Sequence, residues 1–121
     1  MMQDVPSADV VVTNPTHYSV ALKYDKNGSG APLLIAKGGD EMAMHIRTIA
    51  KAHDITILST PPLARSLFHT TGVGDEIPEE LFMAVAQVLA YVFQLRAFLQ
   101  GKAPRPSPLT KNLPIPKQVQ Y

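Results

Sequence analysis

Two sequences that strongly favour extended strands are separated by only four residues near the start of the chain. The first is the β-branched run at residues 10–13, and the second is the sequence YSVALKY at residues 18–24. Between them, Pro15 fixes its own φ and pushes Asn14 toward an extended conformation. We therefore expect two strands, residues 10–13 and 18–24, joined by a tight turn.

The Asn14–Pro15 bond in this turn has chemistry of its own. The side-chain nitrogen of Asn14 can reach the Asn14 carbonyl carbon and close a five-membered succinimide, which breaks the bond to Pro15. Pro15 is a tertiary amide without an N–H and with a weakened trans preference, which suits a leaving group. His17 lies three residues after Asn14, a spacing that a turn closes, and its imidazole can relay a proton or anchor the turn. One interpretation is a single-turnover self-cleavage between Asn14 and Pro15, in which Thr16 positions the turn.

An ordinary turn is the alternative for the same four residues. Asn-Pro pairs commonly form turns, and the proline in the middle of the Asn-x-Thr sequence excludes glycosylation. The two flanking strands favour cleavage, because a strained turn persists only in a rigid frame. On the residues alone, a self-cleaving turn and a docking turn that is never cut both remain open.

Short apolar runs alternate with helical patterns in the middle of the chain. Further strands are expected at residues 33–36 and 55–58, and helices are expected to begin at Asp40, which can cap the first of them, and at Thr60-Pro61. The apolar stripe of the first helix comprises Met42, Ile46, Ile49 and Ala50. This alternation predicts an α/β fold, with a small central mixed sheet of about four strands surrounded by about three to four helices.

A long apolar helix is expected at residues 81–99, opened by Pro78 and two acidic residues. Its composition resembles a membrane span, but two internal glutamines, Arg96 and its marginal length favour a buried core helix. The surplus apolar surface near Phe93 and Phe98 is a candidate docking surface.

The last part of the chain, residues 101–121, is rich in proline. Prolines interleaved with Lys and Arg cannot build a helix or a central strand, so we expect a disordered tail. Two interpretations of this tail remain open: a recognition arm, or a solvated terminus without a specific role.

Composition excludes several classes of function. The chain has 45% hydrophobic residues, enough for one core, and no cysteine, which excludes disulfides and thiol chemistry. A net charge of +1, evenly spread, argues against nucleic-acid binding. The four histidines lack the spacing of metal ligands, and no cofactor loop is found. A small α/β enzyme acting on other molecules is therefore disfavoured, and we expect neither metal nor cofactor.

Residues 14–17 resemble the self-cleavage tetrad of the FlhB/YscU family, the switch proteins of flagellar and type III secretion export. The sequence also resembles this family over residues 8–12, 18–24, 61–65 and 76–81. The resemblance implies that Asn14 is the nucleophile and Pro15 the leaving group, while Thr16 positions the turn and His17 relays a proton or anchors it.

The same resemblance implies a place and partners for the chain. Residues 1–8 would be a linker from an upstream membrane domain, residues 9–100 an autocleaving cytoplasmic domain, and residues 101–121 its flexible tail. The implied location is the cytoplasmic face of the bacterial inner membrane, reached only through the upstream part. Implied partners are export-apparatus membrane proteins, a hook-length ruler protein and exported subunits, and cleavage would switch the class of exported substrate. The alternative within the family is a binding module of the export gate that is not cleaved.

Overall fold

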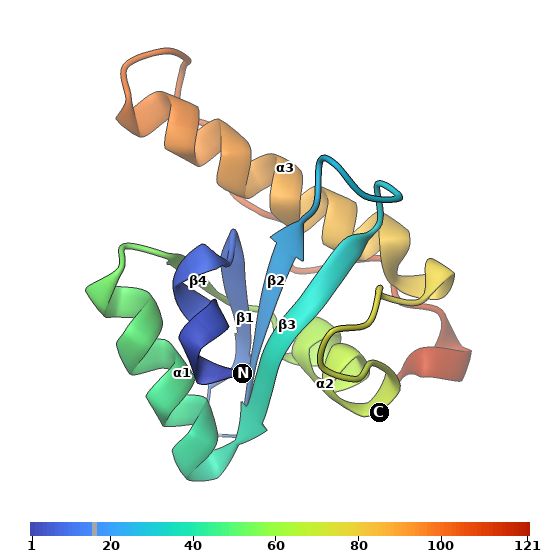
Figure 1. Ribbon diagram of the computed structural model, residues 1–121. Coiled ribbons are helices and arrows are strands. Elements are labelled where there is room, and N and C mark those ends of the chain that lie inside the picture. The colour runs from blue at the N-terminus through green and yellow to red at the C-terminus, as the bar shows by residue number, and fades with distance from the viewer. Residues whose placement is uncertain (16) are drawn as a thin grey trace.

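A four-stranded mixed sheet forms the centre of the computed structural model, which describes residues 1–15 and 17–121 (Figure 1). The strands are β1 (Val10–Asn14), β2 (Tyr18–Tyr24), β3 (Pro32–Gly39) and β4 (Thr56–Ser59). Their order across the sheet is β3-β2-β1-β4, in which β1 and β4 are parallel and the other two pairs antiparallel. The predicted α/β fold with a mixed sheet of about four strands is confirmed.

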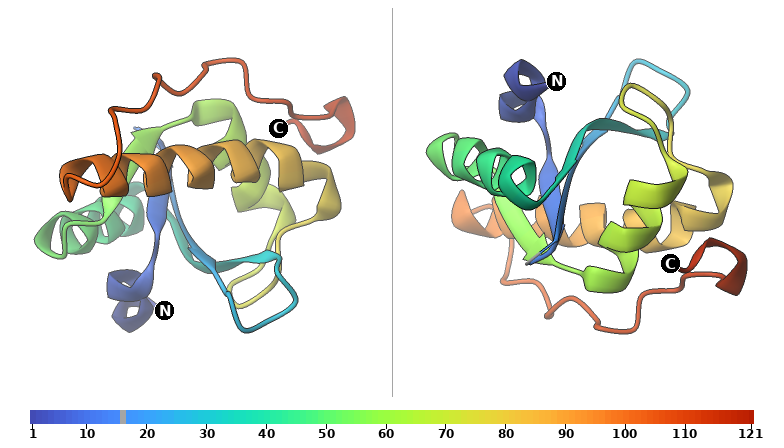
Figure 2. Two further views of the ribbon diagram at one scale, coloured as in Figure 1. Left: turned by 90° about the horizontal axis from the view of Figure 1, so that it is seen from above. Right: turned by 90° about the horizontal axis from the view of Figure 1, so that it is seen from below.

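Helices cover both faces of this sheet (Figure 2). The α-helices are α1 (Asp40–Ala52), α2 (Pro61–Thr70) and α3 (Phe82–Leu99). Short 3-10 helices are η1 (Met2–Ser7), η2 (Glu79–Leu81) and η3 (Lys117–Val119). The buried side chains of η1 and α1 pack on one face, and those of α2 and α3 pack on the other.

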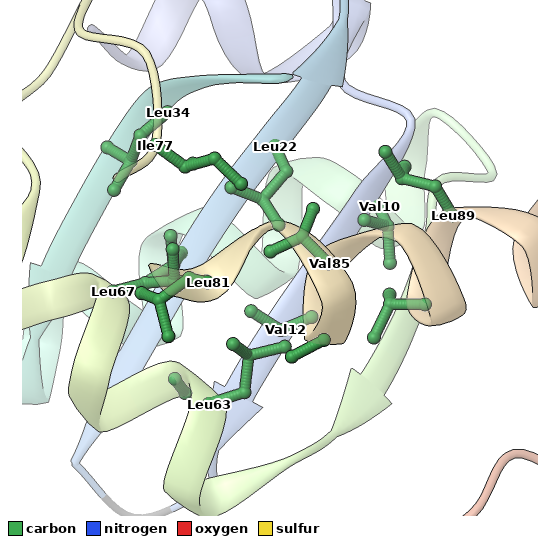
Figure 3. Packing of buried hydrophobic residues seen from close by; sticks show 14 of the residues in the cluster. Val10, Val12, Leu22, Leu34, Leu63, Leu67, Ile77, Leu81, Val85 and Leu89 are labelled. Atoms are coloured by element: carbon green, nitrogen blue, oxygen red, sulfur yellow. The ribbon is translucent and has the colours of Figure 1, made fainter. Parts of the chain in front are cut away.

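Strand β1 shows why both faces can be covered. Successive side chains of a strand point to opposite faces, and every valine in β1 is fully buried. Val10 and Val12 pack with Leu63 of α2 and with the inner face of α3 (Figure 3). Val11 instead packs with Ile46 of α1. At about 1.5–3 kcal/mol for each fully buried aliphatic side chain, this strand is a major source of stability, and it directly precedes the Asn14–Pro15 bond.

The strand boundaries agree closely with expectation. Strand β2 has the predicted bounds, while β1 extends by one residue to Asn14. Strand β3 is longer than predicted, because Gly38 and Gly39 pair with Ser19 and Tyr18 instead of ending the strand.

The start of α1 differs from the prediction. Asp40 was expected to cap the helix, but Gly39 occupies the N-cap position and no side-chain cap hydrogen bond forms. Met42 was expected to face the core and is 43% exposed, whereas Ala43 is buried beside Ile46. The reason is that α1 follows β3 without a loop. The last residues of the strand therefore decide which side of the helix faces the core.

Helix α3 is buried on one side, as expected for a core helix. Within the described residues, the segment Glu79–Leu99 is the one helix long and apolar enough to cross a membrane by length and composition. Its inner residues are buried against the sheet and α2: Ala84, Val85, Val88, Leu89 and Val92. Met83 and Leu99 lie on its exposed side.

The C-terminal segment, residues 102–121, differs from the disordered tail that was predicted, because it packs on the domain. It lacks regular structure except for η3, as its prolines predict, but it runs back along the domain past α3 and α2 (Figure 2). Val119 is buried, and Leu109, Leu113 and Ile115 pack against the larger core cluster. The apolar residues between the prolines supply the burial that keeps the segment on the domain.

Candidate functional site

The predicted tetrad forms the connection between β1 and β2. Asn14 is the last residue of β1 and pairs with Tyr18, the first residue of β2. The main-chain N–H of His17 donates a hydrogen bond to the carbonyl oxygen of Asn14 at 2.8 Å, which closes a four-residue turn. Asn14 is half-buried, whereas Pro15 and His17 are exposed. Thr16, predicted to position the turn, lies outside the described residues.

Neighbouring elements hold both ends of this turn. On the β1 side, the N–H of Thr60 donates to the carbonyl oxygen of Thr13 at 2.9 Å. On the β2 side, the N–H of Asp40 donates to the carbonyl oxygen of His17 at 2.9 Å. The residues at the starts of α2 and α1 therefore hold the main chain at Thr13, one residue before Asn14, and at His17, two residues after Pro15. These bonds add to the frame of two flanking strands that the sequence predicted for a reactive turn.

The hydrogen bond from His17 bears directly on the proposed chemistry. The Asn14 carbonyl carbon is the atom that the Asn14 side chain would attack, and its oxygen would carry the developing negative charge. A main-chain N–H at 2.8 Å is already aimed at that oxygen, as donors of an oxyanion hole are. The turn thus combines an electrophilic carbonyl with a donor that can stabilise its tetrahedral intermediate.

The His17 ring lies beside Tyr18, with the ring centroids 6.2 Å apart and tilted by 52°. In the part of the chain that the structure describes, His17 and Asn14 are hydrogen-bonded through their main chains. This main-chain bond does not involve the imidazole, so both roles predicted for His17, proton relay and turn anchor, stay predictions. Residues 1–15 and 17–121 contain no cluster of three or more His, Asp or Glu side chains suited to a metal ion.

A second candidate site is an apolar hollow of about 280 Å³ between β2, β3 and α3. Its walls include Tyr24, Pro32, Phe82, Leu89 and Phe93. Phe93 was predicted to belong to a docking surface, and the structure places it in this hollow. Phe98, predicted with it, instead lies under the guanidinium group of Arg105, 4.7 Å from its ring centroid.

Comparison with known proteins identifies the family. A model described as the FlhB HrpN YscU SpaS Family matches residues 1–92. The chain belongs to this family. The resemblance inferred from residues 14–17 and their flanks is confirmed.

Several relatives are similar over most or all of the chain. The flagellar biosynthetic protein FlhB of Salmonella typhimurium is 49% identical over 121 residues, which are 100% of this chain and 31% of that protein. FlhB of Bacillus subtilis is 49% identical over 96 residues, covering 79% of this chain and 27% of the relative. The chain thus spans about a third or less of the length of the curated FlhB/YscU-family relatives it matches.

Solved structures agree with the fold. The cytoplasmic domain of FlhB from Shewanella putrefaciens matches with a TM-score of 0.94 and 53% identity, covering 99% of this chain and 92% of that one. A mutated EscU C-terminal domain matches with a TM-score of 0.70 and 34% identity, covering 74% of this chain and 89% of the other. This member of the family therefore has the fold of the FlhB cytoplasmic domain.

Sequence reasoning missed the residues that hold the turn. Thr60 and Asp40 act through their main-chain N–H groups, and no side-chain type marks such a role. The aromatic contacts of Tyr18 with α2 were also missed, because Tyr18 and His69 are separated by 51 residues in the sequence.

Proposed function

We propose that this chain is the cytoplasmic part of a flagellar export-apparatus protein that cleaves itself once, between Asn14 and Pro15. The observation that carries the proposal is the hydrogen bond from the His17 N–H to the Asn14 carbonyl oxygen, in a turn held by Thr60 and Asp40. Family membership and the FlhB relatives support the export context.

The reaction begins with attack of the Asn14 side-chain nitrogen on the Asn14 carbonyl carbon. The tetrahedral intermediate carries its negative charge on the oxygen that faces the His17 N–H. The carbon–nitrogen bond to Pro15 then breaks, the Pro15 nitrogen takes up the proton released by the attacking nitrogen, and a succinimide remains at residue 14. Water opens the succinimide and leaves a new carboxyl group there.

The energetics set what the fold must supply. Cleavage within minutes requires a barrier of about 21 kcal/mol, whereas a reaction that takes years has a barrier roughly 6–8 kcal/mol higher. One preorganised oxyanion donor contributes about 3–4 kcal/mol. Orientation of the Asn14 side chain would supply the remainder.

Cleavage would change the turn and leave the body of the domain intact. Strand β1 pairs with both β2 and β4, and its valines are fully buried, so residues 1–14 would stay bound. The altered surface would lie at residues 15–17, where a free imino group replaces the peptide bond. We propose that this local change switches the class of exported substrate through contacts with export-apparatus proteins, a hook-length ruler protein and exported subunits. The full protein would act at the cytoplasmic face of the inner membrane, joined to it upstream of this chain.

Intact mass spectrometry under denaturing conditions tests the cleavage. We expect the parent protein to give fragments 1–14 and 15–121, whose masses add up to the intact chain plus one water. Asn14→Ala should give one uncut chain, and Asn27→Ala, in an exposed turn, should cleave like the parent. A single uncut mass in the folded parent would contradict self-cleavage.

A binding module that is never cut is the second candidate function. The apolar hollow around Phe93 favours it, because exposed apolar concavities commonly bind partners. If Asn14→Ala leaves substrate export unchanged in cells while the parent chain stays uncut, this second function would replace the first.

A further inference from the structure

Four aromatic side chains from distant parts of the chain stack beside the turn. They comprise Tyr18 of β2, Phe68 and His69 of α2, and Tyr121, and we refer to them as the aromatic clamp. The rings of Tyr18 and Phe68 stack with centroids 4.1 Å apart, and the hydroxyl of Tyr18 lies 3.4 Å from Nε2 of His69. On its other side, His69 stacks with Tyr121 at 4.9 Å. The His69–Tyr121 pair has the spacing of a favourable aromatic contact, and the Tyr18 and Phe68 rings lie closer still.

One end of the clamp adjoins the Asn14–Pro15 bond. Tyr18 is the β-ladder partner of Asn14 and directly follows His17, the donor to the Asn14 carbonyl oxygen. Its ring is held against Phe68, whose carbonyl oxygen accepts a hydrogen bond from Nζ of Lys37 at 2.8 Å. Movement of Tyr18 would therefore move the residue that supplies the oxyanion donor.

The other end of the clamp belongs to the C-terminal segment. The side chain of Arg65 donates a hydrogen bond from Nε to the main-chain oxygen of Tyr121 at 2.8 Å. Among the described residues, the hydrogen bonds of residues 103–118 stay within the segment itself. Hollows of about 390 and 370 Å³ lie between this stretch and the start of α2. Residues 119–121, with buried Val119 and the bond from Arg65, therefore attach the end of a segment whose middle is held by the apolar contacts of Leu109, Leu113 and Ile115.

We propose that the aromatic clamp positions the Asn14–Pro15 turn for cleavage and couples it to the attachment of the C-terminal segment. The inference rests on the proposed self-cleavage. Tyr18 and Tyr121 are positioning residues in this scheme: Tyr18 holds the His17 N–H against the Asn14 carbonyl, and Tyr121 holds His69 against Tyr18. Release of the C-terminal segment, for example by a partner that binds it, would loosen the turn and slow the reaction.

Cleavage kinetics provide the first test. The protein would be made by pulse-labelled cell-free synthesis and quenched in denaturant at successive times. One aromatic contact corresponds to roughly a 2- to 10-fold change in rate, and we expect Tyr121→Ala to slow cleavage by that factor. Tyr121→Phe keeps the ring and should restore the parental rate within about twofold. Gln118→Ala, at an exposed position of η3, is the matched control and should match the parent.

Amide hydrogen exchange provides a second test that does not need cleavage. In the Asn14→Ala protein, Tyr121→Ala should raise the exchange rate of the His17 N–H by a similar factor, and Gln118→Ala should leave it unchanged. The proposed role of the clamp would be contradicted if Tyr121→Ala left the exchange rate of the His17 N–H unchanged, or if it left the cleavage rate unchanged. An uncut parent protein would contradict the proposed function and the coupling of the clamp to cleavage. The exchange rate of the His17 N–H would still show whether the clamp holds the turn.

Discussion

The carbonyl oxygen of His17 accepts a hydrogen bond from the N–H of Asp40 at 2.9 Å. The backbone φ of Asp40 is 48°. Residues with a Cβ rarely adopt this left-handed conformation. The structure thus accepts local strain at the residue that ties the start of α1 to the turn between β1 and β2.

Substitution of Asp40 should reveal this strain. Asp40→Gly removes the Cβ clash but adds chain entropy to the unfolded state, so we expect a gain of between zero and about 1 kcal/mol in the free energy of unfolding. Asp40→Val, which is β-branched, should lose at least about 1 kcal/mol. Urea denaturation of both variants measures the difference. A loss of stability in Asp40→Gly would mean that the aspartate side chain stabilises this conformation.

The two glycines before Asp40 should differ in their tolerance of alanine. A Cβ on Gly38 would lie 2.3 Å from Cγ and 2.7 Å from Cβ of Met42. We expect Gly38→Ala to lower the free energy of unfolding by about 1–3 kcal/mol through overpacking. At Gly39 the nearest atom is the His17 carbonyl oxygen at 3.5 Å, and Gly39 has an ordinary φ of −108°. Gly39→Ala should therefore change stability by less than about 0.5 kcal/mol, and equal losses at both sites would contradict the close approach of α1 to Gly38.

Two buried serines should respond in opposite ways to alanine. The hydroxyl of Ser19 donates to the Ala43 carbonyl oxygen at 2.9 Å and lies 3.3 Å from Nη1 of Arg47. The hydroxyl of Ser66 is buried without a partner among the described residues. Ser19→Ala should lower the free energy of unfolding by about 1–2 kcal/mol, whereas Ser66→Ala should leave it unchanged or raise it by up to about 1 kcal/mol. Thermal and urea unfolding of the two variants, measured side by side, checks the contrast. A clear loss in Ser66→Ala would show that its hydroxyl is hydrogen-bonded in solution.

The carboxylate of Asp9 should matter more than its ion pair with Arg96. Asp9 accepts the N–H of Tyr24 at 2.7 Å, while the guanidinium of Arg96 lies 3.5 Å away and its side chain is 46% exposed. Asp9→Ala leaves the Tyr24 N–H without its partner and should lower the free energy of unfolding by about 1–2 kcal/mol. Arg96→Gln should cost less than about 1 kcal/mol, and added salt should reduce that small effect further. If both variants lose the same stability, the ion pair would be the dominant contact.

Most of the sheet could be predicted from local sequence. The run of valines before Asn14 and the sequence YSVALKY located β1 and β2, because β-branched residues and a proline break are local signals. The start of α1 is less predictable: the local pattern wrongly favours Asp40 as a cap and Met42 as a core residue. Both errors arise because β3 continues through Gly38 and Gly39 by pairing with β2, a contact between distant residues that sets where the helix begins.

The candidate site was predictable only in part. Asn14, Pro15 and His17 were selected because their side-chain chemistry is specific, and their roles, like that of Thr16, stay predictions. The main-chain donors of Thr60 and Asp40 carry no signal in residue type, so their role became visible only once the elements were assembled.

The sequence by itself determined that a turn after Asn14 joins two strands and that proline prevents α-helix and β-strand after residue 101. These outcomes depend on the conformational preferences of single residues and their neighbours. Only the tertiary structure decided that the C-terminal segment lies on the domain and that Tyr121 reaches His69 beside the turn. That arrangement depends on apolar burial between residues far apart in the chain, and burial is decided by the assembled surface against which a segment packs.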